Sequence, residues 1–298
     1  MQRLKTLAIA TAMSILTSTA IVAGPSFDTA SIEKITGLKG QYTETEQVFK
    51  ISRPRTDVQV NVDNWKMPPF MGLTSWAAFT SGQDHLMMMG DTVLFEDEVN
   101  SVMSAAFESG LEVTALHNHF FFDNPKVYFM HIGGMGNEIT LANGVKHVYE
   151  TIDAIRKAKP EPQKSFDGEI PSISTISAPP LEELFGKKGE SKDGMFKISF
   201  GRASSMHGKP IANAMGVNTW AAFAGTDDKA VVDGDFAMLP NEMQGVLKTM
   251  RGGGINVVAI HQHMTDEEPH YLFMHYWGKG RAADLAKTIQ KAMKTQSP

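Results

Sequence analysis

The sequence predicts an α+β fold made of two tandem copies of one sheet-and-helix unit, packed together about a pseudo-twofold axis. The first observation is a duplication: residues 71–136 align with 215–280 at a constant offset of 144, and 22 of the 66 aligned pairs are identical. The second is that alternating apolar segments of strand length surround a helical segment in each copy. A repeating unit of roughly 120 to 150 residues has the ordinary size of a domain.

The first 23 residues are expected to form a cleaved secretory signal peptide. Arg3 and Lys5 precede an uncharged apolar run over 7–22 that ends in small residues. No later segment is long and apolar enough to cross a bilayer. The chain has no cysteine, which excludes disulfides, thiolate metal sites and a lipid-modified cysteine. We therefore expect a periplasmic or secreted protein whose mature chain has no transmembrane segment.

The first repeat is expected to occupy residues 31–158. It starts with a short helix that ends at a glycine, and strands follow before an amphipathic helix that begins with acidic residues. A hairpin and a last helix complete the unit. The predicted elements are a helix over 31–40, strands over 48–52, 57–62, 71–79 and 86–94, a helix over 95–109, a hairpin over 111–134 and a helix over 145–158.

Residues 159–179 are rich in proline, serine and threonine and are expected to form a linker. The second repeat is then expected over 180–298. Its start, LEELFGKKG, matches IEKITGLKG near the start of the first repeat, and FKIS occurs at the corresponding place in both copies. The two units therefore share their order of elements from end to end.

A hairpin rich in histidine occurs once in each copy, and its pattern is identical. It consists of a His-x-His pair, a proline six residues later and a third histidine six residues after that: His117, His119 and His131, and His261, His263 and His275. If the first hairpin is centred on Pro125, His119 lies opposite His131, and His117 shares their face because side chains alternate along a strand. Three imidazoles would then converge in each copy.

The same alternation places these histidines on an apolar, core-facing stripe with Leu111 and Val113. Neutral imidazole is a common ligand of zinc, copper and iron, and three such ligands with an open position suit a catalytic metal site. The alternative is a set of structural histidines that form hydrogen bonds inside the core. Met130 and Met274, which would suit copper(I), are expected on the opposite strand face from the neighbouring histidines.

Several acidic and aromatic residues also repeat at the same offset. Asp91 and Asp235 follow a glycine at strand positions and are candidate additional metal ligands; turn chemistry is the alternative. Glu98 and Glu242 are candidate general bases beside a metal-bound water, with a helix first-turn charge as the alternative. Trp76 and Trp220 are expected in the core, with a wall on which a ligand stacks as the alternative.

The WAAF element, the helix closed by glycine and the H-[NQ]-H…P…FMH run resemble the LppY/LpqO-type family of exported bacterial proteins. The resemblance covers both halves. It implies export and this tandem architecture, but no established activity. The chain differs from the lipoprotein namesakes because it lacks a cysteine for lipidation.

The leading hypothesis is an exported protein that binds a transition metal through both histidine clusters, with metal-assisted hydrolysis as the first reaction to test. The alternative is a non-catalytic periplasmic module with structural histidines that binds a small molecule or an envelope component. In that case Phe120, Phe121 and Phe122 would contact a partner, and self-association is left open. A net charge of −5 and the lack of a basic patch with aromatic residues argue against nucleic acid.

Overall fold

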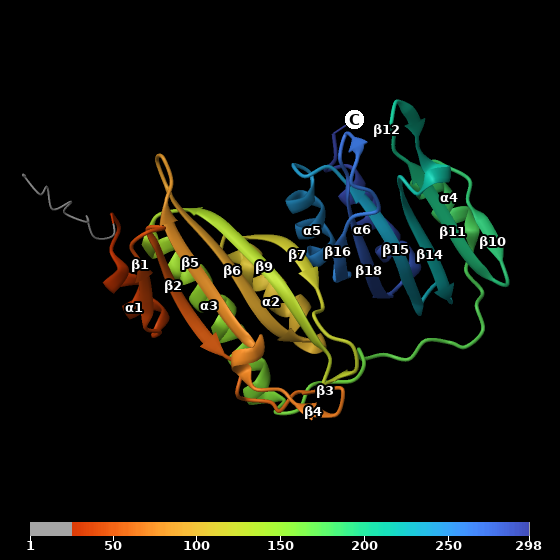
Figure 1. Cartoon of the computed structure of the whole chain (residues 1–298). Coiled ribbons are helices and arrows are strands. Elements are labelled where there is room, and N and C mark those ends of the chain that lie inside the picture. Colours follow the sequence, from red (N-terminus) through yellow and green to blue (C-terminus); the bar gives the residue numbers. More distant parts are fainter. Residues whose placement is uncertain (1–25, 298) are drawn as a thin grey trace, which may run out of the picture.

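The computed structural model describes residues 26–297 and has the predicted α+β fold, with two similar halves side by side (Figure 1). The expected signal peptide lies outside these residues. In the described part of the chain, no helix combines the length and the apolar character needed to cross a membrane. The halves are connected by residues 159–177, which run between helices α3 and α4.

One antiparallel sheet of twelve strands extends through both halves. Each half contributes six strands, and the edge strands of the two halves, β7 and β16, meet in the middle through the pair Leu116 and Ile260. In spatial order the strands are β1 (Gly40–Thr43), β2 (Val48–Pro54), β5 (Thr74–Ser81), β6 (Leu86–Phe95), β9 (Val127–Gly136), β7 (Glu112–His117), β16 (Asn256–His261), β18 (Leu272–Gly280), β15 (Ala230–Met238), β14 (Asn218–Gly225), β11 (Met195–Gly201) and β10 (Glu190–Lys192).

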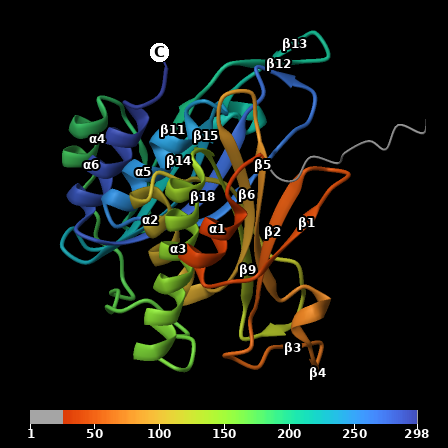
Figure 2. The ribbon, with the colours of Figure 1, turned by 90° about the vertical axis from the view of Figure 1, so that its left-hand side faces the viewer.

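The helices cover one face of this sheet, as Figure 2 shows. Their apolar sides pack against every second residue of the strands, and this layer is the main hydrophobic core. The helices are α1 (Thr29–Thr36), α2 (Glu96–Glu108), α3 (Glu138–Ala158), α4 (Ala178–Phe185), α5 (Met243–Gly252) and α6 (Ala282–Met293). We call the other face of the sheet the open face.

Two small three-stranded sheets lie at opposite ends of the molecule (Figure 2). They consist of β3 (Asn61–Val62), β4 (Trp65–Lys66) and β8 (Asp123–Asn124), and of β12 (Ser204–Met206), β13 (Lys209–Ile211) and β17 (Glu267–Glu268). The prediction of a strand over 57–62 was wrong for most of its length. Val58 and Val60 alternate with polar residues because this loop packs on open-face residues such as Phe129.

The two halves are joined by a reciprocal pair of side-chain amides. The amide of Asn100 on α2 accepts a hydrogen bond from the N–H of Val257 (2.8 Å) and donates to its carbonyl (3.2 Å). Gln244 on α5 makes the same two bonds with Val113, at 3.2 Å and 2.8 Å. Both pairs are related by the offset of 144, so the predicted pseudo-twofold packing is confirmed.

The register of the histidine hairpins differs from the prediction. Ala115, not His119, pairs with His131, and His117 pairs with Phe129. The chain leaves the large sheet at His117 and forms β8 in the small sheet before it returns, so the connection is longer than a turn centred on Pro125. Ala259 and His275 pair in the same way in the second half.

The histidines are also not part of the main core. Leu111 and Val113 face the helices, but a β-bulge between Val113 and Ala115 adds one residue and turns the rest of β7 over. His117 therefore lies on the open face. The prediction of a single core-facing stripe was wrong because it assumed unbroken alternation. Met130 and Met274 do lie in the main core, opposite the histidines as predicted.

Candidate metal centre

In the second half, three neighbouring strands bring an aspartate and the histidines to one place on the open face. Asp235 on β15 pairs with His275 on β18. His261 is the last residue of β16, and His263 follows in the loop. Since paired residues of antiparallel strands point to the same side, the strands direct these groups toward one another.

Asp235, His261 and His263 form a group that could hold a metal ion. Their potential ligand atoms all lie within 4.8 Å of one another. Oδ2 of Asp235 is 3.0 Å from Nε2 of His263 and 4.0 Å from Nε2 of His261. The carboxylate is only 3% exposed, whereas the imidazoles are partly exposed, so solvent or a ligand can reach them.

The ring of His263 is fixed by contacts on two sides. Its Nδ1 lies 3.1 Å from the carbonyl oxygen of Gly216, and the ring stacks on Phe273 with centroids 3.5 Å apart. A carbonyl oxygen only accepts, so Nδ1 donates to Gly216, and Nε2 is the ring nitrogen that faces Asp235. A histidine that binds a metal is commonly oriented by such a bond to its other ring nitrogen.

His275 lies next to this group but does not converge with it. Its ring is stacked on that of His261, with centroids 4.6 Å apart and planes 10° apart, and its Nδ1 lies 3.3 Å from the carbonyl of Gly234. Of the candidate ligands that the sequence indicated in this half, Asp235, His261 and His263 therefore lie grouped, and His275 lies beside them. Gly216 and Phe273 were missed as supporting residues, although the glycine and the phenylalanine both recur at the repeat offset.

The first half has the same residues in a different arrangement. Nε2 of His117 lies 3.1 Å from Nε2 of His119, His119 stacks on Phe129, and His131 stacks on His117. Asp91 is 8% exposed, and its Oδ1 is buried without a hydrogen-bond partner. In the part of the first half that the structure describes, these side chains form no group of three ligand atoms as compact as that around Asp235.

Burial favours the neutral forms of titratable side chains in both clusters. It lowers the pKa of His117, His119 and His261, and the neighbouring histidines lower each of these further. The charges of the aspartates act in the opposite direction: Asp91 raises the pKa of His117 and His119, and Asp235 raises that of His261, without reversing the net lowering. Burial also raises the pKa of Asp91. The three imidazoles are therefore neutral at pH 7, which is the form that binds metal.

Glu98 and Glu242, the candidate general bases, have their carboxylates occupied. Glu98 is fully buried between Arg55 and Arg156 and also accepts from the N–H of Phe95 at the start of α2. Burial alone would raise the pKa of Glu242, but the hydrogen bond from Arg202 lowers it. These contacts indicate that the two glutamates act in helix capping and ion pairing. We therefore do not propose either of them as a general base.

The two aromatic predictions, for the tryptophans and for the three consecutive phenylalanines, have different outcomes. Trp76 and Trp220 are not in the core: they pair with Asp91 and Asp235 and lie half-buried on the open face. Phe120 packs in the small cluster around Phe129. Phe121 and Phe122 are each 81% exposed and do not pack against the other half.

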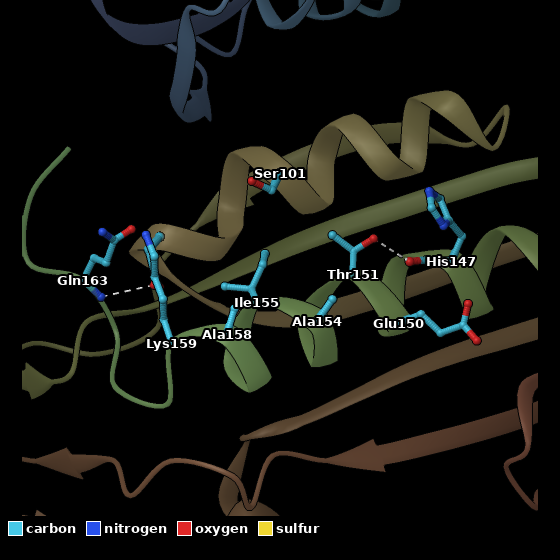
Figure 3. Close-up of a pocket in the computed structure, with 10 residues that line it drawn as sticks. Ser101, His147, Glu150, Thr151, Ala154, Ile155, Ala158, Lys159 and Gln163 are labelled. Carbon is cyan, nitrogen blue, oxygen red and sulfur yellow. Dashed lines mark hydrogen bonds between the residues drawn. The ribbon is translucent and has the colours of Figure 1, made fainter. Parts of the chain in front are cut away.

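A separate hollow of about 620 Å³ lies between α2 and α3, on the helix side of the sheet (Figure 3). Its floor is apolar, with Ala154 and Ala158. Of its two acids, Asp97 already bonds Arg156 and the N–H of Gln163, and Glu150 is the other. Since the open-face histidines do not line this hollow, it is not part of the candidate centre.

Comparison with known families gives one match that covers most of the chain. The pattern of the family described as Domain of Unknown Function (DUF1259) matches residues 30–151 and again residues 179–295. The chain belongs to this family. It therefore contains two tandem copies of the family domain. The description of the matched family does not include the LppY/LpqO name. No curated protein matches the chain.

Two solved structures share low overall similarity with the chain. One is a trimeric bacterial microcompartment shell protein, PduB, with 9% identity and a TM-score of 0.21 over 86% of this chain and 89% of that chain. The other is a double-ringed trimeric shell protein from the RMM microcompartment, with 11% identity and a TM-score of 0.18 over 82% of this chain and 95% of that chain. Scores this low carry no argument about the function of this chain.

Proposed function

We propose that the chain binds a divalent transition metal through Asp235, His261 and His263. The observation that carries this proposal is the compact group of one carboxylate and two imidazoles, in which Gly216 and Phe273 hold the ring of His263. Two imidazoles and one carboxylate leave coordination positions open for water or a ligand. His275 supports the site by packing on His261.

The donor set favours zinc or iron(II). Both metals are bound in enzymes by two histidines and a carboxylate. Copper(I) prefers soft sulfur ligands, but Met274 beside His275 lies in the core on the other face. A metal held in this way can activate a bound water near neutral pH, so metal-assisted hydrolysis is the reaction class that we infer first.

The proposal extends to the first half and to the location of the protein. Asp91, His117 and His119 are the corresponding ligands, with His131 as the counterpart of His275. We expect this site to bind more weakly, since His119 has no counterpart of the bond from His263 to Gly216 in the described contacts. Export to the periplasm or the medium remains part of the proposal because of the sequence before residue 24.

The test is metal analysis of untagged protein by mass spectrometry, followed by titration of the metal-free protein with zinc and iron(II). We expect bound metal in the wild type and its loss from the second half in His263→Ala and Asp235→Asn. His147→Ala is the control, because His147 lies on α3 and pairs only with Glu108. Metal-free wild-type protein that takes up neither ion would overturn the proposal.

A further inference from the structure

The open face carries a strip of functional side chains that runs across the strands in each half. In the second half, Lys197 on β11 is followed by Trp220 on β14, Asp235 on β15, His275 on β18 and His261 on β16. In the first half, Lys50, Trp76, Asp91, His131 and His117 follow in the same order from β2 to β7. The two strips meet at the junction of β7 and β16.

Strand register places the members of a strip on one face. Trp220 pairs with Asp235, which pairs with His275. Lys197 lies two residues before Ser199, the partner of Trp220, so its side chain points to the same side. The alternate residues Phe196 and Ile198 face the helices, in the main core.

The outer end of each strip combines an indole with a lysine. The ammonium of Lys197 lies 4.3 Å from the ring centroid of Trp220, and that of Lys50 lies 4.2 Å from the centroid of Trp76. The lysines are exposed and the tryptophans are half-buried, although none of the described helices covers this face (Figure 2). A cation–π pair of this kind is attractive on its own, but it also places a positive charge and a flat apolar surface beside a candidate metal centre.

We propose that Trp220 and Lys197 bind a ligand that carries a carboxylate and a flat ring face, next to the metal at Asp235. This inference rests on the proposed function and names the ligand class of the same site. The ring packs against the indole, and the carboxylate accepts from the lysine ammonium or coordinates the metal. A metal held by Asp235, His261 and His263 would leave positions at which a further oxygen of the ligand could bind.

Two kinds of molecule share this chemistry, an acidic sugar and an aromatic carboxylate. Galacturonate represents the first and 4-hydroxybenzoate the second. Binding of each to zinc-loaded protein is measured by calorimetry. We expect one of the two to bind, and its dissociation constant to rise by about tenfold or more in Lys197→Ala and in Trp220→Leu, because each variant removes one favourable contact.

Matched variants separate recognition from folding and from metal binding. Lys192→Ala removes an exposed lysine from β10 and should leave affinity unchanged. Lys197→Arg keeps the charge and should restore most of the affinity. Metal content is measured for every variant, and we expect it to be unchanged in Lys197→Ala because Lys197 is not a ligand of the metal group.

Failure of the inference is distinguishable from failure of the proposed function. The probes are tested up to about 10 mM, the order of magnitude that still detects weak ligands. If the protein binds metal but neither probe binds at that concentration, the strip is not a ligand site. The same holds if Lys197→Ala and Trp220→Leu both leave the affinity unchanged. If the wild type binds no metal, the proposed function fails. Probe binding that still requires Trp220 and Lys197 would then support the strip alone, and its absence would overturn both.

Discussion

The amide of Asn100 is the most direct test of how the two halves are held together. Asn100→Ala removes both hydrogen bonds to Val257, which is 1% exposed and lies at the bulge of β16. The N–H and the carbonyl of Val257 would stay buried without partners. An orphaned buried backbone group costs about 1–3 kcal/mol, so we expect the free energy of unfolding to fall by about 2–4 kcal/mol.

Urea unfolding followed by far-UV circular dichroism measures this loss. Gln244→Ala is the matched variant, because Gln244 makes the equivalent bonds to Val113, and it should cost a similar amount. Ser101→Ala is the control on the exposed side of α2. If Asn100→Ala changed the free energy of unfolding by less than about 0.5 kcal/mol, as exposed substitutions do, the amides would not stabilise the junction and our reasoning would be refuted.

Two further predictions concern protonation and buried charge. Burial lowers the pKa of His261 in the folded protein, so as pH falls the unfolded chain takes up protons first, near the ordinary histidine value of about 6.5. Metal-dependent thermal stabilisation should therefore be present at about pH 7.5 and lost at about pH 5, and a chelator that never shifts the melting temperature at the higher pH would contradict this. Glu98→Gln removes the carboxylate that Arg55 and Arg156 share, while Asp57 and Asp97 still pair with them, and should cost about 1–3 kcal/mol in urea unfolding. Glu108→Gln on the exposed end of α2 is its control, and equal effects of the two variants would rule out the buried ion-pair role.

The sequence predicted the fold class well because the duplication shows directly in the residues. A constant offset identified the repeats, and the periodicity within them predicted most strands and helices. The local errors came from tertiary packing. The loop over 57–62 alternates because it covers the open face, and Trp76 is apolar and large but is placed beside Asp91 by strand pairing. Alternation alone cannot say which face of a sheet the helices will cover.

The candidate site was predicted as a neighbourhood and not as a geometry. The repeated histidines identified the hairpins, and strand pairing stacks the third histidine of each hairpin on the first. Asp235, His261 and His263 were all among the candidate ligands, but their grouping without His275 could not be predicted. It depends on a loop that brings His263 back over Phe273 and on the carbonyl of Gly216, 47 residues away in the chain. A sequence shows donor types and spacing along one strand, whereas coordination depends on contacts between segments.

The β-bulge in each hairpin connects the site with the assembly of the halves. Without the extra residue after Val113, His117 would face the helices together with Val113, and the imidazoles would lie in the main core. The bulge turns the end of β7 over and places His117 on the open face. Val113, the residue before the bulge, directs its N–H and carbonyl toward the other half. Gln244 of the other half satisfies both groups. Each half therefore satisfies a backbone N–H and a carbonyl beside the bulge of the other half, which gives a physical reason for the two copies to remain packed as a pair.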